Sequence, residues 1–292
     1  MNRFCLLMLL IWLATSAATP PLRAQSSPDG VRLLPGATLT PPLLAAPREV
    51  RTGLRKEIGS SRMRLDIGTV LDLVGYIPDR AWELRLGADI FAYGLTRSSE
   101  GLRLQVDAID GFFGGHLALQ HDRHPTTALL RLRILHHSAH FVDGHYDLSR
   151  DEWKGGVEPT PYTRDAGELL LTVGHTWGDV RIEFYGGAEY ATLMRPEAMA
   201  RWSFLGGVQA RMILLEAFLG RPCSGYFAYH LGVDGIPEYE SSHTIHGGVK
   251  FGAWQDRGIR IYGEFSAGLE PFGQYYTVRR DHWGVGFALD IW

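Results

Sequence analysis

Apolar and charged residues alternate along several separate segments of this chain, and this alternation restricts the possible folds more than any other feature. From Trp82 to Ala92 the even positions are apolar, while the odd positions include Glu83, Arg85 and Asp89. Successive side chains of a β-strand point to opposite faces. The segment therefore predicts a strand with one apolar face and one charged face.

The same rule recurs later in the chain. The segments starting at Val180, Ile245 and Ile259 each place their apolar residues in one phase and their charged residues in the other. The phase that carries charge contains both signs: Glu83, Arg85, Asp89, Arg131, Arg133, Arg181, Glu183, Lys250, Arg260 and Glu264. Such a set suits an enclosed polar interior whose groups pair with one another, with the apolar face toward lipid. A soluble sandwich would also alternate, and its apolar phase would then need a second sheet to cover it.

The spacing of the connections favours a transmembrane barrel. Short turns are expected near 121–125, 177–179 and 255–258, and long loops near 143–164, 193–201 and 270–282. Alternating short and long connections are typical of an antiparallel up-and-down meander in a membrane. About eleven strands can be recognised from Arg64 onward, and single-chain bacterial barrels have even numbers. We therefore expect an all-β transmembrane β-barrel of about twelve strands over residues 61–292. Residues 25–60 would form an N-terminal extension that includes the missing strand.

The first residues resemble a secretory signal peptide. Arg3 supplies a positive charge, an apolar run follows from Phe4 to Leu13, and small residues come next. Cleavage is expected after Ala18 or after Ala24, so that residues 1–24 are at most the signal. The final strand ends on Trp292, and an aromatic C-terminus resembles the signal that barrel-insertion machinery reads. These features predict export and assembly in a Gram-negative outer membrane.

Composition excludes several other classes. After the signal no apolar run is long enough for a membrane-spanning helix. Cys223 is then the only cysteine, so no internal disulfide can form. The formal net charge of -3 argues against a nucleic-acid partner. We expect lipids and lipopolysaccharide as partners, and no cofactor.

One strand carries a polar set in its apolar phase. Between Thr126 and Val142, the phase opposite Arg131 and Arg133 contains His136, Ser138 and His140. A serine becomes a nucleophile when a base lies within hydrogen-bond reach, and residues two apart on one strand face are neighbours. The pattern would place a serine and histidines against lipid, near a long loop.

A lipid-facing His-x-Ser on a strand resembles the arrangement in outer membrane phospholipase A and in the lipid A deacylase of the same membrane. The resemblance implies that a third group on an adjacent strand orients the histidine. Antiparallel pairing would bring Asp165 and Glu168 beside His136 and Ser138, and Asp143 is a third candidate.

Two other interpretations of this segment stay open. The histidines and serine can form a polar rim that contacts loop backbone and lipid headgroups. The density of His136, His137, His140, Asp143 and His145 is also compatible with a zinc or calcium site, provided that the strand has ended before them.

Several motifs together resemble one bacterial family. They are the stretch Pro41 to Arg48, Trp82-Glu83-Leu84, the stretch Leu132 to His140 with Asp143, Glu264, Gly273-Gln274-Tyr275-Tyr276, and the strand from Trp283 to Phe287. The chain resembles the family catalogued as domain of unknown function 1207 over nearly all of its mature length. The resemblance implies an exported, barrel-like protein and brings no activity. Ala139 and Gly144 depart from the family pattern, in which serine and an acidic residue are usual.

The last long loop supplies candidate binding residues. Gln274 and Tyr275 lie in it, Arg279 and Arg280 follow, and Glu264 precedes it. We interpret the loop as packed over the barrel mouth, while the two arginines suit phosphates of lipopolysaccharide.

Three functions follow from this sequence. The first is a barrel without catalysis that binds, supports structure or allows narrow transport. The second is a lipid esterase with Ser138 as nucleophile, His136 as base and an acidic residue as orienter. The third is a soluble periplasmic β-protein.

Overall fold

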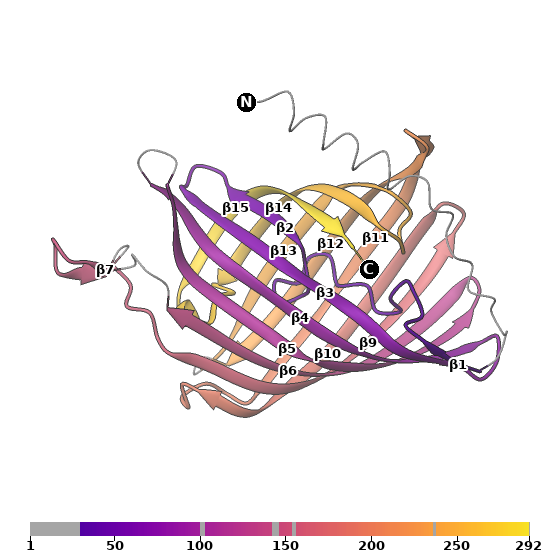
Figure 1. Cartoon of the computed structure of the whole chain (residues 1–292), viewed down its shortest axis with the longest axis horizontal. Coiled ribbons are helices and arrows are strands. Elements are labelled where there is room, and N and C mark those ends of the chain that lie inside the picture. Colours follow the sequence, from indigo (N-terminus) through magenta and orange to yellow (C-terminus); the bar gives the residue numbers. More distant parts are fainter. Residues whose placement is uncertain (1–29, 100–102, 142–145, 154–155, 236–237, 292) are drawn as a thin grey trace.

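The computed structural model describes residues 30–99, 103–141, 146–153, 156–235 and 238–291. The expected signal peptide lies outside these residues. The described chain is built almost entirely from antiparallel strands that close into a barrel (Figure 1). The wall consists of β1 Gly30–Leu33, β2 Gly53–Glu57, β3 Arg62–Ile77, β4 Trp82–Ser99, β5 Arg103–Arg123, β6 Thr126–Phe141, β9 Tyr162–Trp177, β10 Val180–Arg195, β11 Trp202–Phe218, β12 Arg221–Gly235, β13 Tyr239–Phe251, β14 Gly258–Leu269 and β15 Arg279–Asp290.

The barrel has twelve strands, as the sequence predicts. Each long strand pairs with the next one in the chain, β15 pairs with β2, and β3 pairs with both β2 and β4, which closes the ring. β1 pairs with residues 74–77 of β3 and β2 pairs with residues 63–66 of the same strand. β1 and β2 therefore share one position in the wall.

The two faces of the wall follow the alternation in the sequence. On β4, Leu86 and Ile90 are exposed on the outside, while Arg85 and Asp89 are buried inside. Along β6, Leu132 and Ile134 point outward and Arg131 and Arg133 point inward. The outside of the barrel is an apolar band, which in water would be costly and in hydrocarbon is favourable.

Exposed aromatic residues gather near both ends of this band. Near one end lie Tyr76, Trp82, Trp177 and Phe218, and near the other lie Tyr190, Trp202, Phe204, Tyr239 and Trp283. Aromatic rings concentrate at the two interfaces of membrane-spanning barrels, where a ring can contact both hydrocarbon and water. The two belts are therefore arranged as in a barrel that spans a bilayer.

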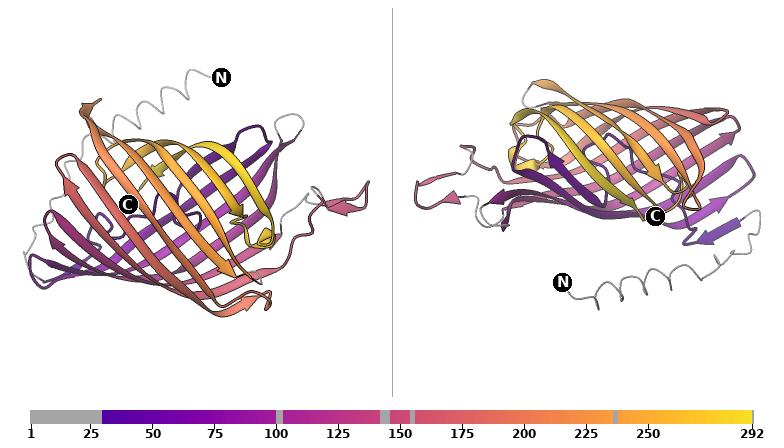
Figure 2. Two further views of the ribbon diagram at one scale, coloured as in Figure 1. Left: turned by 180° about the vertical axis from the view of Figure 1, so that it is seen from behind. Right: turned by 90° about the horizontal axis from the view of Figure 1, so that it is seen from above.

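The connections differ between the two ends. At the short-turn end, the turns at 124–125, 178–179 and 219–220 have two residues each. The other end, the long-loop end, carries the loops at 142–161, 196–201 and 270–278. The first of these contains a small hairpin, β7 Tyr146–Asp147 and β8 Glu152–Trp153, that projects from the barrel (Figure 1). The steeply tilted wall continues around the back of the molecule (Figure 2).

The chain between β1 and β2 lies inside the barrel; we call residues 34–52 the inner segment. Prolines at 35, 41, 42 and 47 prevent it from continuing as a wall strand. Its Leu44 and Ala45 pack against Tyr226 and Tyr262 of the opposite wall. The N-terminal extension expected from the sequence is thus part wall and part filling.

No helix in the described part of the chain is long and apolar enough to cross a bilayer. Within the described residues the only helical element is the short 3-10 helix η1 Gly273–Tyr275, in the loop before β15.

Candidate functional site

The interior of the barrel is filled with paired charges, and the inner segment supplies several of them. Glu49 accepts a hydrogen bond from Arg131 at 2.5 Å and lies 3.3 Å from Arg133. Glu168, on the neighbouring strand β9, bonds the same two arginines at 2.8 and 2.9 Å. Two guanidinium groups and two carboxylates therefore neutralise one another, all of them buried.

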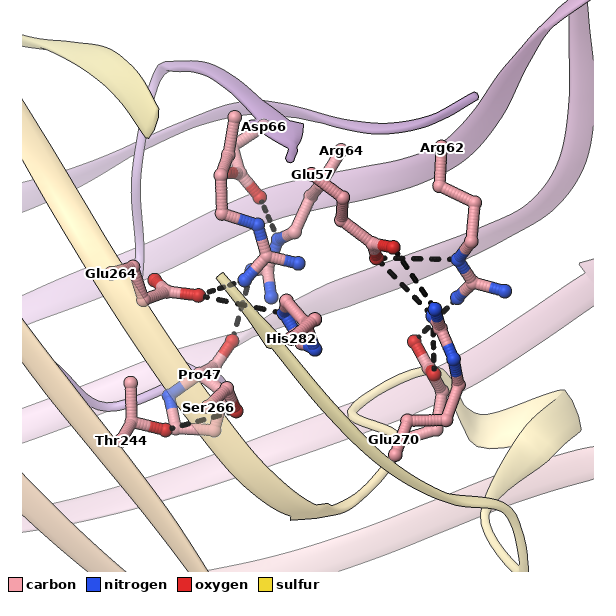
Figure 3. Close-up of polar contacts among 12 residues, drawn as sticks. Pro47, Glu57, Arg62, Arg64, Asp66, Thr244, Glu264, Ser266, Glu270 and His282 are labelled. Atoms are coloured by element: carbon pink, nitrogen blue, oxygen red, sulfur yellow. Dashed lines mark hydrogen bonds and ion pairs between the residues drawn. The ribbon is translucent and has the colours of Figure 1, made fainter. Parts of the chain in front are cut away.

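A second cluster links the inner segment to β2, β3 and β14. Glu264 pairs with Arg55, and Arg51 lies 3.9 Å from both Glu264 and Asp66. Arg64 bonds Asp66 at 2.6 Å and also donates to the backbone carbonyl of Pro47 (Figure 3). These contacts fix the backbone of the inner segment as well as its side chains.

A third cluster closes the long-loop end. Arg62 bonds Glu57 at 3.2 Å and Glu270 at 2.7 Å, and Arg280 reaches the same two carboxylates (Figure 3). Because the four residues come from β2, β3, β15 and the loop before it, the cluster ties that loop to the wall.

Arg48 connects the inner segment to the far wall. Its guanidinium meets the carboxylate of Asp234 on β12 through two bonds of 3.2 Å. This neighbouring carboxylate raises the pKa of Arg48 above its ordinary value, so the pair stays ionised.

The loop before β15 folds into the mouth of the barrel at the long-loop end. Phe272, Gln274 and Tyr275 are buried, and the backbone N–H of Gly273 donates to Asp110 at 2.7 Å. A Cβ on Gly273 would lie 2.4 Å from the ring of Tyr162, so this position requires glycine. Burial raises the pKa of Tyr275. The sequence interpretation of a loop packed over the mouth agrees with this placement.

Little space remains beside the inner segment. A cavity of about 80 Å³ lies between Ala46 to Glu49 and the side chains of Arg133, His230 and Asp234. This volume holds a few water molecules.

A different set of polar groups faces outward on β6 and β9. His136 lies directly opposite Asp165, and its Nδ1 is 2.5 Å from the carboxylate. Both side chains are partly exposed on the outer face of the wall, with side-chain exposures of 31% and 43%. The pairing that the sequence predicts between these strands places Asp165 beside His136.

Apolar side chains border this pair. Phe113 on β5 is opposite His136, lies 4.7 Å from its ring and is 58% exposed. Leu193 on β10 is opposite Asp165 and is also exposed. The His136–Asp165 pair is therefore a polar site within the apolar outer face, near the long-loop end.

Ser138 also lies on this outer side, but it bonds a different histidine. Its Oγ is 3.1 Å from Nε2 of His140. The contacts are thus divided into a carboxylate–imidazole pair and a hydroxyl–imidazole pair. A triad needs one imidazole to contact both the carboxylate and the hydroxyl, so a side-chain rotation at His136 or Ser138 would have to join the two pairs.

The other two acids proposed to orient His136 were Glu168 and Asp143. Glu168 was expected beside His136, and this is wrong: Glu168 points into the interior and is held by Arg131 and Arg133. Residues of opposite phase on one strand face opposite sides, so Asp165 and Glu168 could not both have served. Asp143 lies outside the described residues.

The histidine-rich segment does not converge on one point. His137 faces the interior, where its Nε2 is 2.7 Å from Asp110, while its neighbours face outward. Among the described residues no group of three histidine, cysteine, aspartate or glutamate side chains is placed to hold a metal ion. Asp143 and His145 of the proposed metal set lie outside those residues.

A second serine and histidine pair offers an internal comparison. Ser241 and His243 on β13 also lie two residues apart, with Oγ 3.2 Å from Nε2, near the same end of the barrel. His243 has a tyrosine hydroxyl on its other nitrogen, where a catalytic histidine would need a carboxylate. A serine beside a histidine is therefore not distinctive here, and Asp165 is what distinguishes the first site.

The remaining candidate residues are mostly engaged in the wall. Arg279 pairs with Glu240 at the long-loop rim and is half exposed. Arg280 and Glu264 belong to the interior clusters, so they are not open to lipopolysaccharide phosphates in this arrangement.

Sequence reasoning missed the inner segment as a set of functional residues. Arg48, Glu49 and Arg51 were the available signal, because three ionisable residues within four positions of a proline-rich stretch need partners when buried.

A structural comparison finds several solved structures that are similar to this chain. The structure of OccAB1 from Acinetobacter baumannii is 9% identical, with a TM-score of 0.37, covering 89% of this chain and 72% of that one. A bacterial polysaccharide outer membrane secretin is 11% identical, with a TM-score of 0.33, covering 81% of this chain and 96% of that one. The search of curated proteins finds no match.

The family comparison agrees with the motifs in the sequence. One family model matches residues 81–290, from the start of β4 to the end of β15, and so spans most of the barrel wall. The chain belongs to the family described as protein of unknown function DUF1207.

Proposed function

We propose that this protein is an outer-membrane β-barrel whose interior is occluded by its own inner segment and which works by binding, not by letting solutes diffuse through it. The observation that carries the proposal is the position of residues 38–51. They contact β3 through Asp72, β11 through Gln209, β12 through Asp234 and β6 through two arginines. A segment anchored on all sides of the interior blocks a solute path.

The anchors are too numerous for thermal opening to be frequent. Glu49 and Arg51 form buried ion pairs, and Arg48 forms a partly buried one, each with a different part of the wall. Breaking one partner of a buried pair costs about 3–5 kcal/mol. An open state that breaks three such pairs would be rarely populated.

Conductance across a planar lipid bilayer tests the occlusion. We expect the full-length protein to insert without steady current steps, and a variant lacking residues 38–50 to show them. Steady ohmic steps from the unmodified protein, of the size that the variant gives, would contradict the proposal. Heat-modifiable migration on a gel establishes that each preparation is folded before it is measured.

A second function is favoured by one observation, the 2.5 Å contact between His136 and Asp165 on the lipid-facing side. In this proposal the protein is an outer-leaflet lipid esterase. Asp165 holds the imidazole of His136, His136 takes the hydroxyl proton of Ser138, and Ser138 attacks an acyl ester. The C–O bond of the ester breaks, His136 returns the proton to the leaving alcohol of the lipid, and water then hydrolyses the acyl-serine to release the fatty acid. The apolar surroundings would present the ester bond of a lipid to the serine.

Hydrolysis of phospholipid and lipid A in mixed micelles tests the esterase. Ser138→Ala should abolish fatty-acid release, and Asp165→Asn should lower the rate by about 10⁴-fold, as loss of the orienting acid does in triads. Ser241→Ala is the matched control, since it removes the same hydroxyl–imidazole contact without a carboxylate nearby, and should leave the rate unchanged. Equal release by the unmodified protein and Ser138→Ala would eliminate this function.

A further inference from the structure

The short-turn end of the barrel contains an open cavity that neither proposed function uses. It has a volume of about 570 Å³. It lies among the turns that follow β5, β9, β11 and β13. Its lining includes Arg181, Arg211 and Trp254. We call it the mouth cavity. It is about seven times as large as the cavity beside the inner segment.

Arg211 is the unusual residue of the mouth cavity. Its guanidinium lies over the ring of Trp254, 4.8 Å from the centroid. Among the described residues, no hydrogen bond or ion pair joins this guanidinium to another side chain. Most of the other interior arginines of the described barrel pair with a carboxylate, as Arg131, Arg164 and Arg260 do.

The neighbours of Arg211 leave its charge unbalanced. Arg181 is directly opposite it across β10 and β11. Glu183, two positions from Arg181 on the same strand, uses one oxygen for Arg181 at 2.7 Å and the other for Gln209 at 2.6 Å. Asp122 and Asp179 also line the cavity, and among the described residues no ion pair joins either carboxylate to Arg211. Like charges directly opposite in a sheet repel each other. The pair of arginines thus has one carboxylate between them, and that carboxylate is already occupied.

The ring of Trp254 has a second cation beside it. Lys250 lies 5.4 Å from the ring centroid and shares the carboxylate of Asp290 with Arg260. Stacking on an aromatic ring holds a guanidinium in place while its N–H edges stay free. The edge of Arg211 is therefore fixed and available.

We propose that the mouth cavity binds a small soluble oxyanion, a phosphate or carboxylate group, on the guanidinium of Arg211. Such a group meets the planar fork of arginine with two parallel hydrogen bonds and relieves the repulsion from Arg181. The cavity opens among the turns at the short-turn end, so the ligand is a solute of the aqueous side at that end. The volume limits it to a small organic molecule or the free ion.

Calorimetric titration tests the site with the full-length protein in uncharged detergent. The first probe is inorganic phosphate at constant ionic strength, with chloride replaced ion for ion. We expect saturable binding of phosphate to one site. Arg211→Gln should weaken this binding about tenfold or more, because the variant loses the hydrogen bonds between the guanidinium and the charged phosphate. Arg211→Lys keeps the charge without the fork and should fall between the two. Arg221→Gln is the matched control: Arg221 is exposed at the same end and does not line the cavity.

A second probe separates the possible sources of phosphate. Micelles doped with phosphatidic acid present the same group on a lipid. Binding of the lipid without binding of free phosphate would overturn the proposal, as would equal phosphate binding by the unmodified protein and Arg211→Gln. Because conductance measures the occlusion separately, a failure of this site leaves the occluded barrel standing, and the reverse also holds.

Discussion

Single residues in the interior show how strongly this barrel depends on complete pairing. His116 on β5 lies between two carboxylates, with Nε2 2.9 Å from Asp72 and Nδ1 2.8 Å from Asp89. All three side chains are buried. One imidazole thus keeps two acids of β3 and β4 apart from each other and satisfied.

Replacing His116 therefore gives the first prediction. His116→Leu should leave Asp72 and Asp89 facing each other, and should lower the free energy of unfolding by about 3–5 kcal/mol, the usual cost of unpairing a buried charge. The measurement is the urea midpoint in phospholipid vesicles. His121→Leu is the control: His121 stacks on the exposed Trp82 at the short-turn end and should cost under about 1 kcal/mol. Equal losses would mean that the interior acids are not paired through His116.

The residue scale also explains why the candidate site was only partly predicted. Strand phase placed His136 and Ser138 on the outer face, because phase depends only on counting along a strand, and antiparallel pairing brought Asp165 beside them. It could not reveal that Ser138 bonds His140 instead of His136, since this depends on side-chain rotation. Glu168 was misassigned because the position of the adjacent strand was considered without its phase.

Among the elements, the inner segment is the one that the sequence describes least well. The wall strands were predicted because alternation repeats over many residues, whereas residues 34–52 have no period and contain four prolines. Their position follows from distant partners such as Asp234 and Gln209, which lie more than 150 residues later in the chain. Local pattern carries no information about contacts of that separation.

Protection of the inner segment from trypsin gives the second prediction. Arg51 is 4% exposed and Arg48 pairs with Asp234, so cleavage after either should be slow, while Arg150, with 74% of its side chain exposed, should be cut early. Glu49→Gln removes a carboxylate from Arg131 and Arg133 and should speed cleavage after Arg48 and Arg51. Mass spectrometry of the peptides over time measures this.

The matched control for that experiment is Glu197→Gln, which changes the same group on an exposed loop. It should leave the cleavage pattern unaltered. Cleavage of the unmodified protein after Arg51 as fast as after Arg150 would show that the segment does not stay inside the barrel.

At the scale of the whole molecule, the apolar band and the filled interior are consequences of one arrangement. A barrel in lipid must place its polar groups inside, and here those groups pair with each other, with the inner segment and with the loop that contains Phe272. The interior then has both salt bridges and apolar clusters, so it packs as a core instead of enclosing a water-filled channel. The same packing leaves Arg211 and the mouth cavity as the place where an unpaired charge meets open volume.

Depth in the membrane gives the last prediction. Ile134 lies at the middle of β6 and is 65% exposed on the outer face, whereas Leu219 lies in a short turn and is 92% exposed. In a bilayer, Ile134→Arg should cost about 2–4 kcal/mol and Leu219→Arg about 0–1 kcal/mol, because the penalty for a charge follows its depth in hydrocarbon. Urea titration of both variants in phospholipid vesicles measures the difference. A soluble β-protein would give nearly equal, small costs for two exposed positions. Equal costs for the two variants would therefore contradict a position of the barrel in a bilayer, and with it the lipid-facing position of Ser138.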